Sequence, residues 1–75
     1  MDDTLFYKKL GQNIKVLRMQ AGLTQEKLAE KAGISLDYMG KIEVSINRPG
    51  LKTILKLATA LNVEPCKIFE INVMC

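Results

Sequence analysis

Two short helical segments constrain the fold of this sequence more than any other feature. Each begins after a hydroxyl residue, and the short stretch 32–34 joins them. Thr24 and Ser35 suit the N-cap position, because a side-chain hydroxyl accepts a hydrogen bond from an otherwise unpaired amide of the first turn. Both are flanked by apolar pairs with the spacing of a hydrophobic staple, namely Leu23 with Leu28 and Ile34 with Met39. Gly33 can take the left-handed conformation that ends the first segment. This pattern predicts a helix-turn-helix.

A longer amphipathic helix is predicted before this pair, from about Thr4 to Gln20. Its apolar stripe recurs at steps of three or four residues and consists of Phe6, Leu10, Ile14, Leu17 and Ala21. Three polar residues, Lys8, Gln12 and Lys15, fall outside this stripe. Gly22 follows as a left-handed stop.

A fourth helix is predicted after a surface loop at residues 44–50. It runs from about Leu51 to Leu61, and Asn62 can close it in a left-handed conformation. Its broad apolar face comprises Leu51, Ile54, Leu55, Leu57, Ala58 and Leu61. Such a face requires neighbouring helices to cover it.

A short fifth helix begins at Pro65, which suits the first helical position, and Ile68 and Phe69 would supply its core contacts. The tail, residues 70–75, alternates roughly between apolar and polar, so a short strand, a frayed end and a partner contact all stay open. We therefore predict an all-α fold, a compact five-helix bundle that contains the helix-turn-helix. The 75 residues suffice for one domain, 1–75, with its core at about 5–69.

Composition excludes several functional classes. Histidine is absent and no CxxC motif occurs, so the usual ligand set of a structural zinc site is missing, and Cys66 and Cys75 are expected to be reduced thiols. We find no nucleophile–base pair and no glycine-rich phosphate loop, and therefore expect no enzyme, no cofactor, no metal and no small-molecule ligand. No apolar run approaches the ~20 residues that span a bilayer, and the acidic start at residues 1–3 does not resemble a signal peptide. A soluble, cytoplasmic protein with no membrane contact is expected.

Several segments, taken together and in order, resemble the Cro/C1-type (Xre-like, lambda-repressor-like) helix-turn-helix family. They are residues 22–29 (GLTQEKLA), 33–35 (GIS), 41–43 (KIE), 51–58 (LKTILKLA) and 61–63 (LNV). The resemblance covers about residues 10–70 and extends to phage repressors and restriction-modification controller proteins. It implies that the third helix, about 36–44, enters the major groove of DNA while the second crosses the backbone. It also implies a homodimer on a near-palindromic operator.

The outward face of the third helix carries the candidate base contacts, which are Leu36, Asp37, Gly40 and Lys41. Lys41 can donate to guanine O6 or N7, and Asp37 can accept from cytosine N4. Leu36 offers an apolar surface to a thymine methyl group. Alternatively, Asp37 and Lys41, four residues apart, form only a solvated ion pair worth about 0.3 kcal/mol. Gly40 either permits close approach to the bases or is simply tolerated at a cost of roughly 1 kcal/mol.

Four more residues are candidates for contacts to the DNA backbone. The resemblance assigns a phosphate contact to Gln25, at the start of the second helix, where the helix dipole favours an anion. Asn47 and Arg48 lie in the loop that tracks the phosphates in the family, and a guanidinium suits bidentate phosphate binding. Tyr38 either reaches a phosphate with its hydroxyl or packs on the core.

The resemblance also implies a largely buried ion pair between Arg18 and Glu43, which would tie the first helix to the third. The sequence departs from the family at three positions: Val44 replaces a frequent basic residue, Ser45 a frequent glycine, and Gly50 a frequent hydroxyl cap. Ser45 must therefore adopt the backbone of the turn without the freedom of glycine.

Together these features predict a sequence-specific transcriptional regulator that binds double-stranded DNA. The net charge of +3 favours an acidic partner such as DNA. Apolar residues at the C-terminal end, namely Ile68, Phe69, Ile71 and Val73, could form a homodimer contact, although Ile68 and Phe69 could instead fill the core of the monomer. The alternative function is a protein-interaction module, antitoxin-like or adaptor, on the same fold.

Overall fold

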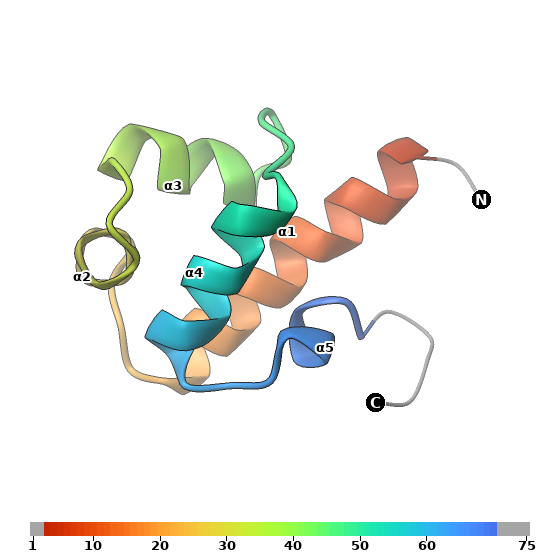
Figure 1. Ribbon diagram of the computed structural model, residues 1–75. Coiled ribbons are helices and arrows are strands. Elements are labelled where there is room, and N and C mark those ends of the chain that lie inside the picture. The colour runs from red at the N-terminus through yellow and green to blue at the C-terminus, as the bar shows by residue number, and fades with distance from the viewer. Residues whose placement is uncertain (1–2, 71–75) are drawn as a thin grey trace.

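The computed structural model describes residues 3–70, which form five helices and no strand (Figure 1). These helices are α1 (Asp3–Gln20), α2 (Gln25–Ala32), α3 (Leu36–Glu43), α4 (Leu51–Leu61) and α5 (Pro65–Ile68). The all-α prediction is confirmed. Two boundaries differ by one residue: α1 begins at Asp3 rather than Thr4, and α3 ends at Glu43, with Val44 as its C-cap residue.

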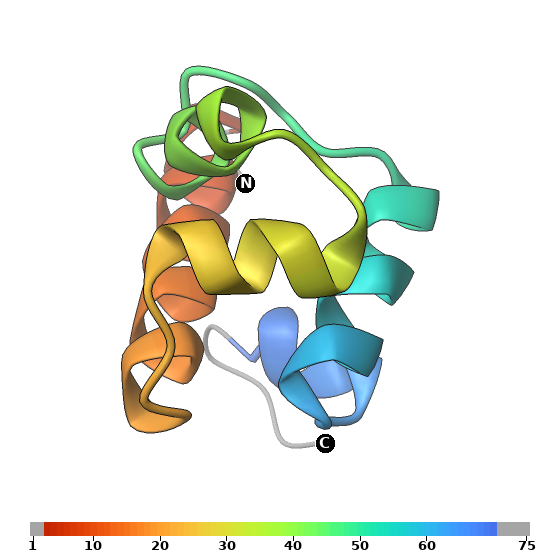
Figure 2. The same cartoon turned by 90° about the vertical axis from the view of Figure 1, so that its left-hand side faces the viewer.

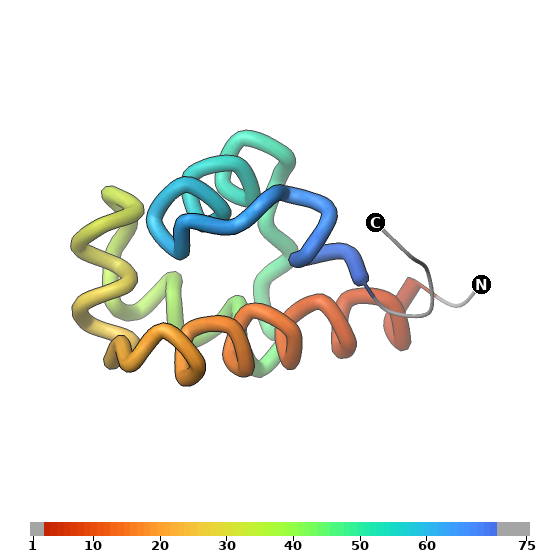
Figure 3. The backbone as a smooth tube through the Cα atoms, turned by 90° about the horizontal axis from the view of Figure 1, so that it is seen from below, coloured from red at the N-terminus to blue at the C-terminus, as the bar shows by residue number. Residues whose placement is uncertain are grey.

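The helix-turn-helix pair is packed against α1 and α4. Figure 1 shows α2 end-on while α3 lies across the view, and Figure 2, turned by 90°, shows the reverse, so the two helices cross steeply. The longest helix, α1, packs against α3 and α5, while α4 packs against α2 and α5. Seen from below in Figure 3, α1 runs along one side of the molecule and α4 and α5 along the other.

The caps of α2 and α3 form as the sequence predicts. The Thr24 hydroxyl accepts from the Lys27 amide at 3.1 Å, and the Ser35 hydroxyl accepts from the Tyr38 amide at 3.0 Å. Gly33 ends α2 with a φ of 72°, a left-handed conformation that costs glycine no Cβ clash. These local signals fix where α2 ends and α3 begins.

The ends of α4 are also as predicted. Gly50 occupies the N-cap position and contributes no side-chain hydrogen bond, while Asn62 closes the helix with a φ of 58°. Pro65 stands in the first turn of α5, where its missing amide hydrogen leaves no helical hydrogen bond unmade.

Every helix contributes to one apolar core. Its fully buried large side chains are Leu10, Ile14, Leu28, Met39, Ile42, Ile54, Leu57 and Ile68. Phe6 and Leu17 of the predicted stripe pack on this core and are partly buried. Ala21 does not belong to it, because α1 ends at Gln20 and the turn that follows carries Ala21 to the surface.

The buried face of α4 is narrower than the sequence pattern predicts. Residues 54, 57, 58 and 61 are buried, at the spacing of a single helix face that meets α2 and α5. Leu51 and Leu55, which the prediction placed on this face, are 67% and 46% exposed. They lie at the edge of this face, where the neighbouring helices do not cover them fully.

The C-terminal end of the described chain is anchored to α1. The side-chain amide of Asn13 donates to the carbonyl oxygens of Ile68 at 3.0 Å and Glu70 at 3.2 Å. Ile68 is fully buried, and the Phe69 ring stacks on Phe6 with 6.3 Å between centroids. Ile68 and Phe69 thus pack in the core of the monomer, which was the alternative to a dimer contact.

The other two residues of the predicted dimer contact, Ile71 and Val73, lie outside the described residues, as does most of the tail 70–75. Among the described residues, no helix combines the length and hydrophobicity that crossing a membrane requires.

Candidate nucleic-acid interface

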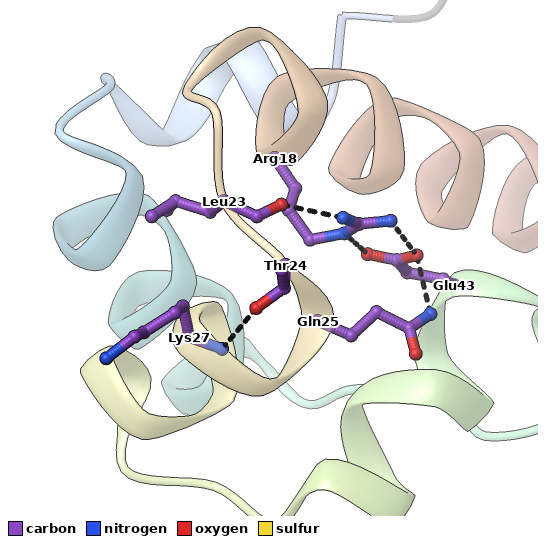
Figure 4. Close-up of polar contacts among 6 residues, drawn as sticks. All are labelled: Arg18, Leu23, Thr24, Gln25, Lys27 and Glu43. Carbon is purple, nitrogen blue, oxygen red and sulfur yellow. Dashed lines mark hydrogen bonds and ion pairs between the residues drawn. The ribbon is translucent and has the colours of Figure 1, made fainter.

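A buried ion pair fixes the position of α3 against α1. The Arg18 guanidinium donates from Nε to Glu43 Oε2 at 2.6 Å and from Nη2 to Oε1 at 3.2 Å (Figure 4). It also donates from Nη1 to the carbonyl of Leu23 at 2.7 Å, just before α2. Only 1% of the Glu43 side chain is exposed. The pair that the family resemblance implied is therefore present.

The same carboxylate also holds α2. Gln25 Nε2 donates to Glu43 Oε1 at 2.9 Å, so that one buried acid joins α1, α2 and α3 (Figure 4). Because a side-chain amide carries two N–H donors, the bond to Glu43 leaves one donor for another acceptor. The predicted phosphate contact of Gln25 stays a prediction.

A close approach of two backbones accompanies the ion pair. A Cβ atom at Gly11 would lie 2.6 Å from the carbonyl oxygen of Ile42 and 2.8 Å from that of Glu43. Only a residue without a side chain lets α1 and the end of α3 pack this closely. Sequence reasoning did not single out Gly11, although a glycine inside a helical pattern is a signal of such a contact.

The predicted base-contacting face of α3 points away from the core. Leu36 and Asp37 are exposed, and Gly40 and Lys41 are partly exposed. Lys41 Nζ lies 2.9 Å from Asp37 Oδ2. The solvated ion pair that we held open as an alternative is therefore present, and it also neutralises an acid that would otherwise repel DNA phosphates.

Two candidates lie closer to the protein interior. Tyr38 is partly buried and packs against the core, in line with the packing interpretation. Gly40 has open space on its outer side: a Cβ built there meets only Gln25 Oε1, at the ordinary contact distance of 3.7 Å. Packing within the domain therefore does not require a glycine at this position.

The loop after α3 is held by the end of that helix. The amides of Ile46 and Asn47 both donate to the carbonyl of Lys41, at 2.9 and 3.2 Å. Ser45 has a φ of 58°, so it adopts the left-handed conformation that family members often give to glycine. Asn47, a predicted contact to the DNA backbone, thereby lies directly beside the end of α3.

Arg48 lies over an aromatic ring of α1. Its guanidinium carbon is 4.6 Å from the centroid of the Tyr7 ring, a cation–π geometry. This contact joins residues far apart in the sequence and was not predicted. Arg48 is exposed, so its guanidinium remains accessible from solvent.

The candidate DNA contacts therefore gather at one end of the molecule. In Figure 1, α3 and the loop after it lie at the end opposite α5. Gln25 is brought into this end by its bond to Glu43, although it comes from α2. The arrangement of a braced helix pair with an outward second helix defines a helix-turn-helix protein.

Comparisons with known proteins agree with this class. A family model described as Helix-turn-helix (HTH_3) matches residues 14–68. The chain is 42% identical over 55 residues to the immunity repressor protein of Bacillus phage phi105, and 41% identical over 54 residues to the HTH-type transcriptional regulator SutR of Escherichia coli K12. These matches cover 73% and 72% of this chain, but only 38% and 30% of the relatives, so the chain spans about a third of their length.

Solved structures share the fold. The restriction-modification controller protein C.AhdI from Aeromonas hydrophila is 43% identical, with a TM-score of 0.83 over 84% of this chain and 96% of that protein. The wild-type controller protein C.Esp1396I is 29% identical, with a TM-score of 0.81 over 87% of this chain and 86% of that protein. The chain belongs to the Cro/C1-type (Xre-like) helix-turn-helix family of transcriptional regulators.

Proposed function

We propose that this chain is a homodimeric regulator that binds double-stranded DNA sequence-specifically and acts in the cytoplasm, with α3 in the major groove of a near-palindromic operator. The observation that carries the proposal is the division of α3 into two faces. Its inner residues Met39, Ile42 and Glu43 are buried. Its outer residues Leu36, Asp37, Gly40 and Lys41 are exposed or partly exposed, so the buried face holds the helix in place while the outer face meets solvent.

Base recognition falls to this outer face. Lys41 donates to a guanine edge, Asp37 accepts from cytosine, and Leu36 contacts a thymine methyl group. On binding, the two side chains of the Asp37–Lys41 ion pair turn toward the groove. The pair either opens or stays closed while Lys41 contacts the guanine and Asp37 the cytosine of one G·C pair. Gly40 lets the helix approach the base edges closely.

Backbone contacts surround this face. The free donor of Gln25, the hydroxyl of Tyr38 and the side chains of Asn47 and Arg48 bind phosphates and set the register of α3 on the duplex. Phosphate contacts supply most of the affinity, whereas the few base contacts supply the choice of sequence.

A homodimer follows from the small reach of one recognition helix. Two copies related by a twofold axis place two α3 helices about 34 Å apart, one turn of the duplex, and read two half-sites. The predicted near-palindrome mirrors this symmetry. The resemblance to the family supports this step.

Selection of bound duplexes from a random pool, at near-physiological salt and with the purified chain, tests the proposal. We expect enrichment of a near-palindrome whose half-sites are centred about 10 base pairs apart. Enrichment of a single half-site without symmetry would overturn the homodimer, and a pool without any enriched sequence would overturn sequence-specific binding.

One observation favours the alternative, a protein-interaction module. A shallow hollow of about 350 Å³ between α2 and α4 is lined by Leu55 and by three lysines, Lys31, Lys52 and Lys56. An exposed leucine together with three lysines suits an acidic segment with an apolar anchor. A random pool without an enriched sequence would make this hollow the next surface to test.

A further inference from the structure

A second cleft lies between α1 and the end of α3. It has a volume of about 300 Å³, and its rim consists of Lys8, Gln12 and Lys15 from α1, Gln25 from α2, and Val44 and Ser45 after α3. The three α1 residues are the polar ones that fall outside the apolar stripe. Because they stand four and three residues apart, one face of α1 presents all of them to the cleft.

The two lysines of this cleft carry uncompensated charge. Within residues 3–70, the ion pairs of the structure join Arg18 to Glu43, Lys41 to Asp37 and Lys67 to Glu70, and none involves Lys8 or Lys15. The one acid that lines the cleft is Glu43.

Glu43 does not neutralise the two lysines. Its side chain is 1% exposed, and both of its oxygens accept hydrogen bonds from Arg18, one of them also from Gln25. Paired with the guanidinium, this acid adds no net charge. The cleft therefore presents two ammonium groups and two side-chain amides, a set of donors that suits an anion with several acceptor oxygens.

The cleft is continuous with the predicted DNA-binding face. Gln25 lines the cleft, and its Oε1 also lies beside Gly40 on α3, 3.7 Å from where a Cβ atom of that residue would stand. The start of α2, which carries the positive end of a helix dipole, lies at the same place. At position 44, where family members often have a basic residue, this chain has an exposed valine at the rim of the cleft.

We propose that this cleft binds the DNA backbone, with Lys8 and Lys15 as the cationic ligands of a phosphate on the strand that passes the start of α2. Gln12 and Gln25 donate hydrogen bonds to the same phosphate or its neighbour. The two lysines of α1 thereby supply the charge that position 44 lacks. This inference rests on the proposed function, because it names a further contact of the same interface.

Salt dependence of binding tests the assignment with the full chain and the selected duplex. The logarithm of the association constant falls as log salt concentration rises, and each phosphate contact that is lost makes this negative slope shallower by about 0.9. We expect Lys8→Gln with Lys15→Gln to make the slope shallower by one to two such steps. The affinities for the selected and a scrambled duplex should fall by the same factor, because phosphates do not report sequence.

Lys56→Gln with Lys67→Gln is the matched control, since it also removes two positive charges, from exposed positions on α4 and α5 outside the cleft. If the cleft variant behaved like this control while the wild-type chain bound DNA with a steep salt dependence, the cleft assignment alone would be wrong. If the wild-type chain showed no salt-dependent binding to any duplex, the proposed function itself would be wrong.

A second measurement separates DNA from free phosphate as the ligand. Amide resonances of Lys8 and Lys15 should shift on addition of the duplex, and shift far less with inorganic phosphate at equal ionic strength. Shifts with inorganic phosphate and none with the duplex would overturn the proposal. The variants and the wild-type chain should have equal melting temperatures. Any loss of binding then comes from the missing lysine charges and not from a disturbed fold.

Discussion

Glu43 accepts hydrogen bonds from Arg18 and Gln25, so a single carboxylate holds three helices together. It is flanked in space by Gly11, whose missing side chain lets α1 reach the carbonyl groups at the end of α3. Lys41, two residues earlier, faces solvent and pairs with Asp37. Two residues that are close in sequence thus have separate roles: Glu43 supports α3, and Lys41 is the proposed DNA contact.

Removal of the buried carboxylate should destabilise the fold far more than removal of the surface lysine. Glu43→Ala leaves Arg18 as an uncompensated, nearly buried charge, so we expect the free energy of unfolding to fall by about 3–5 kcal/mol. For a domain of about 5–10 kcal/mol in total, that loss is severe. Lys41→Ala removes only a surface pair, worth about 0.3–0.5 kcal/mol. Urea unfolding of both variants checks this, and equal losses would refute the separation of the two roles.

Two glycine-to-alanine substitutions should have opposite effects on stability. In Gly11→Ala the new Cβ would lie 2.6 Å from a backbone carbonyl, so α1 and α3 must move apart and the melting temperature should fall. In Gly40→Ala the Cβ has room, and alanine is favoured over glycine in a helix by roughly 1 kcal/mol, so the melting temperature should rise. Thermal unfolding followed by circular dichroism measures both. A rise for Gly11→Ala would contradict the close approach of the two helices.

At the scale of elements, the boundaries of α2, α3 and α4 could be predicted because they depend on adjacent residues. Thr24 and Ser35 cap their helices through amides three residues away, and Gly33 and Asn62 end theirs through their own backbone conformation. Such signals are complete within one turn of helix. They do not require any knowledge of which helices pack together.

Contacts between elements could be predicted only where the family resemblance supplied them. The Arg18–Glu43 pair came from the resemblance, whereas the stacking of Arg48 on Tyr7 did not follow from any local pattern. For the same reason the exposure of Leu51 and Leu55 was missed. Periodicity shows that a face is apolar but not how much of it a neighbouring helix covers.

Ser45 stores a small backbone strain in the turn after α3. Its φ of 58° lies in the left-handed region, which costs residues with a Cβ atom about 1 kcal/mol more than glycine. Ser45→Gly should therefore stabilise the protein by up to that amount, less the greater freedom that glycine gives the unfolded chain. Chemical denaturation of this variant checks the prediction. Gly50→Ala is the comparison, because Gly50 has an ordinary φ of −76° and its backbone carries no left-handed strain. A clear loss of stability for Ser45→Gly would show that its hydroxyl matters more than its backbone.

At the scale of the whole molecule, the fold gathers the proposed DNA contacts at one end. The outer face of α3, the loop after it and the start of α2 lie together, while α5 closes the core at the other end (Figure 1). The overall charge of +3 is modest, so affinity for DNA depends on where the cations stand rather than on their number. The family resemblance implied the grouping of these elements, whereas the cleft beside Lys8 and Lys15 was not predicted from the sequence, because it depends on how α1 packs against α3.

The ratio of dissociation constants for scrambled and selected duplexes, measured by fluorescence anisotropy at one salt concentration, tests the central claim that α3 reads sequence through Lys41. For the wild-type chain this ratio should be large, of the order of 10³ or more. In Lys41→Ala it should fall by the factor that one bidentate base contact supplies, about 1–3 kcal/mol or roughly 5- to 150-fold, while the melting temperature falls by no more than a few degrees. A Lys41→Ala variant that kept the wild-type ratio would contradict the account.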